Sequence, residues 1–206
     1  MGLRDLAYRV YERRLEASLS GHSIPRHVGV ILDGNRRWAR SAGLADVSDG
    51  HQKGADNIFE LLGWCRQAGV EVVTLWLLST DNLSRPRTEV EALLRIIEGT
   101  VRELVVQGWH VKPVGALDLL PVDTAQVLKD AAEATADNPG LLVNVAVGYG
   151  GRQEIADAVR SLLHDHSTKG TTIEELAELL DVEHIADHLY TAGQPDPDLV
   201  IRTSGE

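Results

Sequence analysis

Short apolar, β-branched runs alternate with longer stretches of helical spacing along most of the chain, and this alternation limits the fold more than any other feature. The apolar runs hold only four to eight residues, and polar or glycine residues follow them, as expected of buried parallel strands. Strand then helix, repeated, is typical of an α/β protein with a mostly parallel central sheet flanked by helices. We predict strands at 27–32, 71–78, 110–114, 141–147 and 198–201, and helices at 3–17, 50–69, 90–105, 121–137, 152–165 and 173–189.

The length and composition exclude several classes of protein. The 206 residues suit a single domain over 21–206, preceded by an amphipathic helix within 1–20. One cysteine excludes an internal disulfide, and neither a signal peptide nor an apolar stretch of ~20 residues is visible, so we expect a cytoplasmic protein. The net charge of −11 argues against nucleic acid as a partner.

The charge is unevenly distributed along the chain. Residues 1–40 contain eight arginines and four acidic residues, whereas residues 157–198 contain ten acidic residues and two basic ones. An anionic ligand is therefore expected to bind near the N-terminal third.

Four polar segments follow predicted strands, and each contains glycine, arginine or both. In parallel α/β sheets, ligands bind beyond the carboxyl ends of the strands, which meet at one edge. We therefore expect a ligand site assembled from residues 33–38, 79–85, 148–152 and 202–206.

The segment after the first strand has the composition of a phosphate site. Asp33 and Gly34 precede Asn35, Arg36 and Arg37. Glycine allows a ligand to approach the backbone, arginines bind phosphate oxygens, and one carboxylate among such groups suits Mg²⁺. The same residues are compatible with an ordinary turn in which Asp33 caps a helix and the arginines are solvated.

The remaining motifs are less specific. The 79–85 loop could bind phosphate or simply connect two elements, and the glycine pair at 150–151 could be a phosphate nest or a tight turn. The aliphatic face of the 90–105 helix suits core packing, or an apolar cavity for a lipid-like tail. The sequence contains neither the Rossmann nor the P-loop glycine motif, which argues against a nucleotide-binding Rossmann fold. It also lacks zinc-ligand spacing and the Gly-x-Ser-x-Gly elbow of serine hydrolases.

Five segments together resemble successive motifs of the cis-prenyltransferases, the undecaprenyl diphosphate synthase family. They are 27–39, Gly50-His51, 78–86 with Glu89, 144–152 and 198–206. The resemblance implies that family's α/β fold with an apolar tunnel, and Mg²⁺-assisted condensation of isopentenyl diphosphate with an allylic diphosphate in Z geometry. It also implies isoprenoid biosynthesis, including precursors of a cell-wall lipid carrier, and a homodimer.

The resemblance also assigns roles to individual positions. Asp33 would bind Mg²⁺ as a catalytic residue, and Asn82 would accept a proton. The substrate-binding positions would be Gly34, Asn35, Arg36, Arg37, Trp38 and His51 for the allylic diphosphate, Ser79, Thr80, Asp81 and Arg85 on a closing loop, and Arg202 for isopentenyl diphosphate.

Two departures from the family pattern bear on these roles. Val47 stands where the family often has an arginine, so one diphosphate contact is either missing or supplied by Arg40. Leu77 stands where long-chain members tend to have a small tunnel residue, which favours a short product. The sequence is most similar to short-chain actinobacterial members that make (2Z,6E)-farnesyl diphosphate, which implies geranyl diphosphate as the allylic substrate.

Several alternatives and expectations accompany this prediction. The chain could instead make longer polyprenyl diphosphates, or be a non-catalytic partner subunit, although a degenerate subunit should have lost Asp33 and the arginine pair. The basic N-terminal helix could contact the inner face of the cell membrane or dock on the protein itself. In the family the chain continues beyond the matched Thr-Ser-Gly-Glu, so we expect a C-terminal segment with a second metal ligand and further isopentenyl diphosphate contacts.

Overall fold

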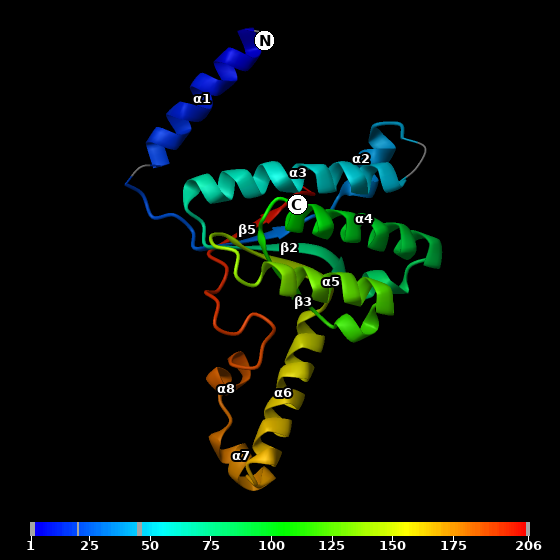
Figure 1. Ribbon diagram of the computed structural model, residues 1–206, viewed down its shortest axis with the longest axis vertical. Coiled ribbons are helices and arrows are strands. Elements are labelled where there is room, and N and C mark those ends of the chain that lie inside the picture. The colour runs from blue at the N-terminus through cyan, green and yellow to red at the C-terminus, as the bar shows by residue number, and fades with distance from the viewer. Residues whose placement is uncertain (1–2, 20, 45–46, 205–206) are drawn as a thin grey trace.

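The central element is a sheet of five parallel strands, in the order β3-β4-β2-β1-β5 (Figure 1). The computed structural model describes residues 3–19, 21–44 and 47–204. The mostly parallel sheet predicted from the alternation is confirmed, and the strand bounds differ from the predicted ones by at most two residues. The strands are β1 (His27–Ile31), β2 (Val72–Ser79), β3 (His110–Val114), β4 (Leu142–Tyr149) and β5 (Leu199–Arg202).

The helices also follow the predicted pattern, with one additional helix at Asn35–Ser41 and one correction. The predicted helix over 173–189 is wrong, because two shorter helices occupy this stretch. Thr172 and Glu175 form a capping box that starts the first, and the Asp181 side chain accepts from the His184 N–H to start the second. The helices are α1 (Leu3–Leu19), α2 (Asn35–Ser41), α3 (Val47–Ala68), α4 (Arg87–Val106), α5 (Val122–Thr135), α6 (Gly151–Thr168), α7 (Ile173–Leu179) and α8 (Val182–Ala186), with 3₁₀ turns η1 (Asp81–Ser84) and η2 (Leu117–Leu119).

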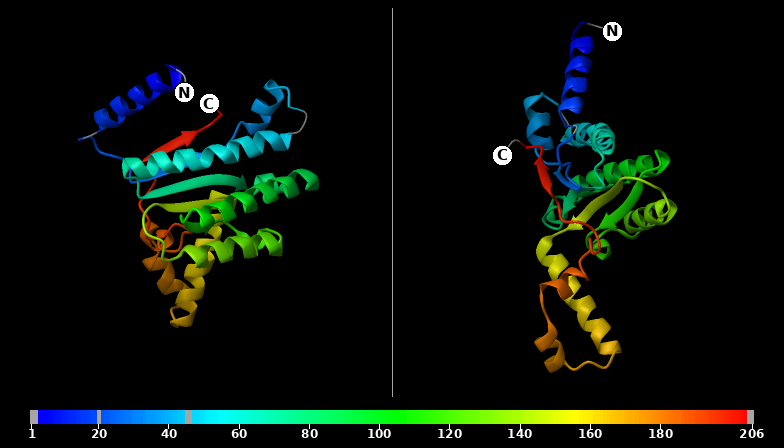
Figure 2. Two further views of the ribbon diagram at one scale, coloured as in Figure 1. Left: turned by 45° about the horizontal axis from the view of Figure 1, so that its top comes forward. Right: turned by 90° about the vertical axis from the view of Figure 1, so that its left-hand side faces the viewer.

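One face of the sheet forms the apolar core against α3, α4 and α5 (Figure 2). Alternate residues of each strand point to this face, as in Val28 and Val30 of β1. The helices contribute one stripe each, and burying these side chains is the main stabilising contribution to the fold. The stripes include Ile58 and Leu62 of α3, Leu94, Ile97, Val101 and Leu104 of α4, and Leu128 of α5.

The opposite face of the sheet carries a buried polar network. His27 contacts the Pro195 carbonyl oxygen through Nδ1 and the Thr74 hydroxyl through Nε2, both at 2.7 Å. Asn144 donates to the same hydroxyl and to Gln194. The network therefore fastens the segment before β5 to the middle of the sheet.

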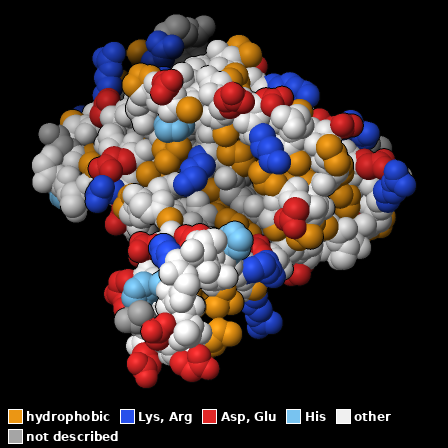
Figure 3. Space-filling view, turned by 60° about the horizontal axis from the view of Figure 1, so that its bottom comes forward, with side chains coloured by type: hydrophobic (Ala, Val, Ile, Leu, Met, Phe, Trp, Pro, Cys, Tyr) orange, Lys and Arg blue, Asp and Glu red, His pale blue; other side chains and the backbone are white. Residues whose placement is uncertain are grey.

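Helix α6 runs away from the sheet, and α7 and α8 return beside it as an arm (Figure 1). Acidic side chains gather at the far end of this arm (Figure 3). Helix α1 stands apart from the sheet and exposes Leu6, Val10 and Tyr11. In the described part of the chain, no helix has the length and apolarity needed to cross a membrane.

The carboxyl ends of the strands meet at one edge of the sheet, where a glycine allows two of the following segments to touch. The Thr80 N–H donates to the Tyr149 carbonyl, and a Cβ on Gly150 would lie 2.7 Å from Thr80 Oγ1. The turn after β4 therefore supports the loop after β2. This gives Gly150 a packing role.

Candidate active site

A cavity of about 440 Å³ lies beyond the ends of β1 and β2, between α2, α3 and α4. Its mouth is lined by polar groups, and its interior by aliphatic side chains. The residues at the mouth are Asp33, Gly34, Asn35, Arg36, Arg37, Arg40, His51, Asn82 and Arg85, and the interior includes the aliphatic residues Ile58, Leu77, Leu93, Ile96 and Ile97. Most of the predicted site residues are thus brought together.

Asp33 is held by the segment that follows β5. The pairing of Ile31 with Arg202 places the two segments side by side. Arg202 Nε donates to Asp33 Oδ2 at 2.7 Å, and the Ser204 N–H donates to Oδ1 at 3.0 Å. Burial alone would raise the pKa of the Asp33 carboxyl, but the hydrogen bonds from Arg202 and Ser204 and the Arg202 charge lower it overall. Asp33 is therefore an anion at neutral pH.

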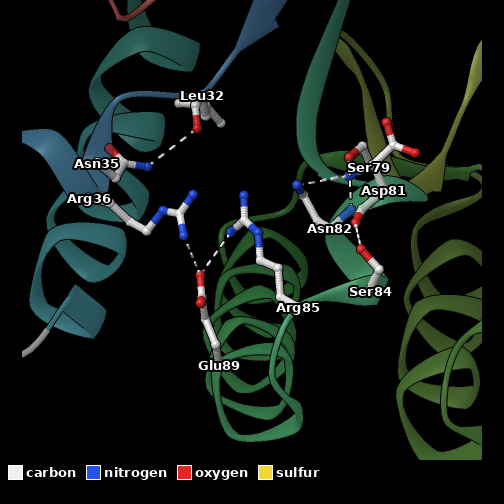
Figure 4. Close-up of polar contacts among 9 residues, drawn as sticks. All are labelled: Leu32, Asn35, Arg36, Ser79, Asp81, Asn82, Ser84, Arg85 and Glu89. Atoms are coloured by element: carbon white, nitrogen blue, oxygen red, sulfur yellow. Dashed lines mark hydrogen bonds and ion pairs between the residues drawn. The ribbon is translucent and has the colours of Figure 1, made fainter.

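Two arginines from different segments converge on one carboxylate at the mouth of the cavity (Figure 4). Arg36 of α2 donates to Glu89 Oε1 at 3.3 Å, and Arg85 donates to the same oxygen at 3.1 Å. Glu89 is not a lining residue of the cavity, so it orients the arginines from outside it. Its position four residues after Arg85 in the sequence could have indicated this pairing.

His51 presents an unpaired nitrogen at the same place. Its Nε2 atom is buried and has no hydrogen-bond partner among the described residues. Burial lowers the pKa of His51, and the neighbouring cations Arg85 and Arg36 lower it further, although Glu89 opposes them. An anion bound in the cavity would give this nitrogen a partner.

The loop after β2 is internally hydrogen-bonded. The Ser79 N–H donates to the Asn82 side-chain oxygen, and the Asn82 N–H donates to Ser79 Oγ (Figure 4). Asn82 and Arg85 line the cavity, whereas Ser79, Thr80 and Asp81 are not among its lining residues. The contacts predicted for these three residues remain predictions.

Leu77 reaches the cavity through an irregularity in β2. The register of β2 against β4 shifts between Trp76 and Leu78, so that both Leu77 and Leu78 pack with the apolar core. Leu77 lines the cavity, and Leu78 is fully buried behind it. The predicted place of Leu77 in a product tunnel and its role in product length stay predictions.

A second hollow adjoins the first cavity and shares Asp33, Gly34 and Asn35 with it. Trp38 lies there and does not line the first cavity. Thr203, which also lines this hollow, belongs to the predicted 202–206 segment, whereas no motif of the sequence singled out Lys53 and Asn57. Arg40 lines the first cavity, so it is placed where it could supply the diphosphate contact of the arginine that the family often has at position 47. The side chain of Val47 itself lies outside the described residues.

Among the described residues, no cluster of three or more His, Cys, Asp or Glu side chains could hold a metal ion alone. Asp33 is a single carboxylate beside a cluster of arginines. This donor set suits Mg²⁺ that arrives with phosphate oxygens, because Mg²⁺ commonly takes one or two carboxylates plus substrate oxygens.

The fold and the cavity define an α/β protein in which arginines and aliphatic side chains line one cavity at the carboxyl ends of the strands. The family model described as putative undecaprenyl diphosphate synthase matches residues 31–206. This chain belongs to that family of prenyltransferases.

Relatives and solved structures agree with this assignment. The chain is 68% identical over 204 residues to the (2Z,6E)-farnesyl diphosphate synthase of Thermobifida fusca, covering 99% of this chain and 80% of that protein. It is 51% identical over 208 residues to the (2Z,6E)-farnesyl diphosphate synthase of Mycobacterium tuberculosis, covering 99% and 79%. A crystal structure of lavandulyl diphosphate synthase from Lavandula x intermedia, in complex with dimethylallyl diphosphate, has a TM-score of 0.77 at 33% identity, covering 86% of this chain and 77% of that one.

Proposed function

We propose that this chain condenses isopentenyl diphosphate with a short allylic diphosphate, such as geranyl diphosphate, to give (2Z,6E)-farnesyl diphosphate. The observation that carries the proposal is a cavity that combines an arginine-lined mouth with aliphatic side chains. A substrate with a diphosphate head and a short isoprenoid tail needs both parts. The relatives named (2Z,6E)-farnesyl diphosphate synthase support the Z geometry and the short product.

In this reaction the allylic C1–O bond breaks, diphosphate departs, and C1 bonds to C4 of isopentenyl diphosphate. Arg36, Arg37 and Arg85 bind the departing diphosphate and stabilise its developing charge. The proton lost from C2 passes to Asn82 or to a diphosphate oxygen. The aliphatic interior holds the prenyl tail and keeps water from the carbon centre.

Asp33 is the residue that would hold the metal. Its carboxylate is ionised. The nearby Ser204 Oγ is buried without a hydrogen-bond partner among the described residues, so this oxygen is available to contact a bound metal or its ligands. Bound Mg²⁺ would neutralise charge on the leaving diphosphate. Arg202 would bind isopentenyl diphosphate, and Gly34 and Asn35 would face the allylic diphosphate.

The test of the site is Asp33→Asn, with geranyl and isopentenyl diphosphates and Mg²⁺. We expect kcat to fall by about 10²–10³-fold, the usual cost of removing one group that stabilises charge in the transition state. Glu71→Gln is the matched control, because Glu71 pairs with Arg26 on the surface away from the cavity. Unchanged turnover in Asp33→Asn would refute the assignment.

Leu77 would limit product length by closing the tunnel. Leu77→Ala should lengthen the product by at least one isoprene unit, which mass spectrometry measures. Leu61→Ala is the control, because Leu61 is also a partly buried core leucine but does not line the cavity. A C15 product from both variants would refute the role of Leu77.

The predicted homodimer and membrane contact also belong to the proposal. The exposed apolar side chains of α1, beside Arg9 and Arg13, offer a surface for an anionic membrane where a lipid product is delivered. Light scattering measures the oligomeric state, and sedimentation with anionic vesicles measures the membrane contact.

A further inference from the structure

The ion pair between Asp33 and Arg202 uses the carboxylate that the proposed function assigns to the metal. Both carboxylate oxygens are engaged, Oδ2 by the Arg202 guanidinium and Oδ1 by the Ser204 N–H. A cation beside a carboxylate disfavours a second cation at the same place, because like charges repel. A divalent ion must therefore compete with Arg202 for Asp33.

The pairing of these residues is built into the sheet. The register of β5 against β1 sets Arg202 beside Ile31, two residues before Asp33. Thr203 donates its hydroxyl to the Asp33 carbonyl oxygen at 2.8 Å, and its N–H donates to the Ile31 carbonyl oxygen at 3.1 Å. The backbone around the ion pair is thus fixed on both sides. Movement of the Arg202 side chain would release Asp33 Oδ2, while the Ser204 N–H would still hold Oδ1.

The side chains are accessible enough for this exchange. Arg202 is 47% exposed and Asp33 is 31% exposed. Ion pairs at this exposure are weak and are readily replaced by a stronger anion. A diphosphate carries more negative charge than one carboxylate and can bind a guanidinium through two oxygens.

We propose that Arg202 is the counter-ion of Asp33 in the substrate-free protein, and that it suppresses metal binding until a diphosphate draws it away. The metal then binds together with the diphosphate and not before it. The same movement frees Arg202 to bind isopentenyl diphosphate. This inference rests on the proposed metal role of Asp33.

The test measures Mn²⁺ binding to the 206-residue chain by electron paramagnetic resonance, with no prenyl substrate. We expect Arg202→Gln to bind Mn²⁺ at least about tenfold more tightly than the unmodified chain, because one competing charge is removed. Arg85→Gln is the matched control. It removes the same charge from a residue that lines the cavity beside Asp33, but the pair that it breaks is with Glu89, so Mn²⁺ affinity should change less than about threefold.

Two further variants separate the possible outcomes. Asp33→Asn in the Arg202→Gln background should abolish the gain, and Arg202→Lys, which keeps the charge, should retain weak binding if Arg202→Gln fails to fold. If the unmodified chain and Arg202→Gln bind Mn²⁺ equally tightly, and Asp33→Asn abolishes that binding, this inference is overturned while the metal role of Asp33 stands. Binding that does not need Asp33 would overturn the metal assignment in the proposed function.

Discussion

At the residue scale, the site depends on charged groups that are held in place before any ligand arrives. Asp33 is fixed by Arg202 and Ser204, while Arg36 and Arg85 share Glu89. Preorganised charges of this kind lower the cost of binding an anion, because few side chains must be ordered at that moment.

Glu89→Gln should weaken binding of the allylic diphosphate. Without the carboxylate, the Arg36 and Arg85 guanidinium groups lose their shared partner and repel each other. We expect KM for the allylic diphosphate to rise about tenfold, which corresponds to ~1.4 kcal/mol, with a smaller change in kcat. Steady-state kinetics measure the split.

The control for Glu89 is Glu91→Gln on the same helix. Glu91 pairs with exposed Arg87 and not with a cavity residue, so KM should stay unchanged. A similar KM for both variants and the unmodified chain would contradict the positioning role of Glu89.

His51 should make stability depend on pH. Its pKa in the folded chain lies below the usual 6.5, chiefly because of burial, so the unfolded chain binds more protons as pH falls through 6.5. The free energy of unfolding therefore decreases on acidification because of His51, by at most about 1.4 kcal/mol per pH unit for one proton. His51→Gln should lose less stability between pH 7.5 and 5.5 than the unmodified chain.

Urea unfolding at both pH values measures the difference for His51. The same substitution at exposed His22 serves as the control and should behave like the unmodified chain. Parallel losses in the His51 variant and the unmodified chain would contradict the assignment.

At the scale of elements, the contact between α2 and α3 sets where the arginines stand. A Cβ on Gly50 of α3 would lie 2.5 Å from the Asn35 carbonyl oxygen and 2.9 Å from the Ala39 Cβ. Glycine at this position lets the two helices approach closely. The approach carries Arg36 to the mouth of the cavity.

Gly50→Ala should therefore destabilise the fold by about 1–3 kcal/mol, the usual cost of overpacking, and should also raise KM. Gly63→Ala tests the same change in the same helix without a neighbour within 4 Å, and it should stabilise by about 0.5–1 kcal/mol. Thermal unfolding measures both. Equal effects of the two substitutions would contradict the packing account.

Helices and strands were predictable wherever the apolar residues of a segment kept one spacing, that of a helix or that of a strand, along its whole length. The strand at 110–114 was predicted to the residue, and the helix predicted to end at residue 69 ends at Ala68, where Gly69 follows at φ +86. The predicted helix over 173–189 failed because its apolar spacing continues across the break. The local cap at Asp181 decides that break.

At the scale of the whole molecule, the sequence predicted which segments gather at the strand ends but not how they touch. The Arg202–Asp33 bond joins residues 169 apart, and the Arg36–Glu89 bond joins residues 53 apart. No local pattern encodes such pairs, since they depend on strand order and register. The apolar cavity was likewise undecided from the sequence, because core packing explains the same aliphatic residues.

The charge asymmetry also has a structural counterpart. Arg36, Arg37 and Arg40, which follow β1, line the cavity. The acidic stretch 157–198 forms much of the α6–α8 arm, and acidic side chains lie at its far end (Figure 3). The field of the molecule thus favours approach of an anionic substrate at the cavity and disfavours it at the arm.

The central claim is that this chain joins one isopentenyl unit to geranyl diphosphate in Z geometry. The most direct measurement incubates the protein with both diphosphates and Mg²⁺, then identifies the dephosphorylated product by chromatography and mass spectrometry against authentic isomers. We predict a C15 product that coelutes with (2Z,6E)-farnesol. A product that coelutes with the all-E isomer, or the absence of any condensation product, would contradict the account.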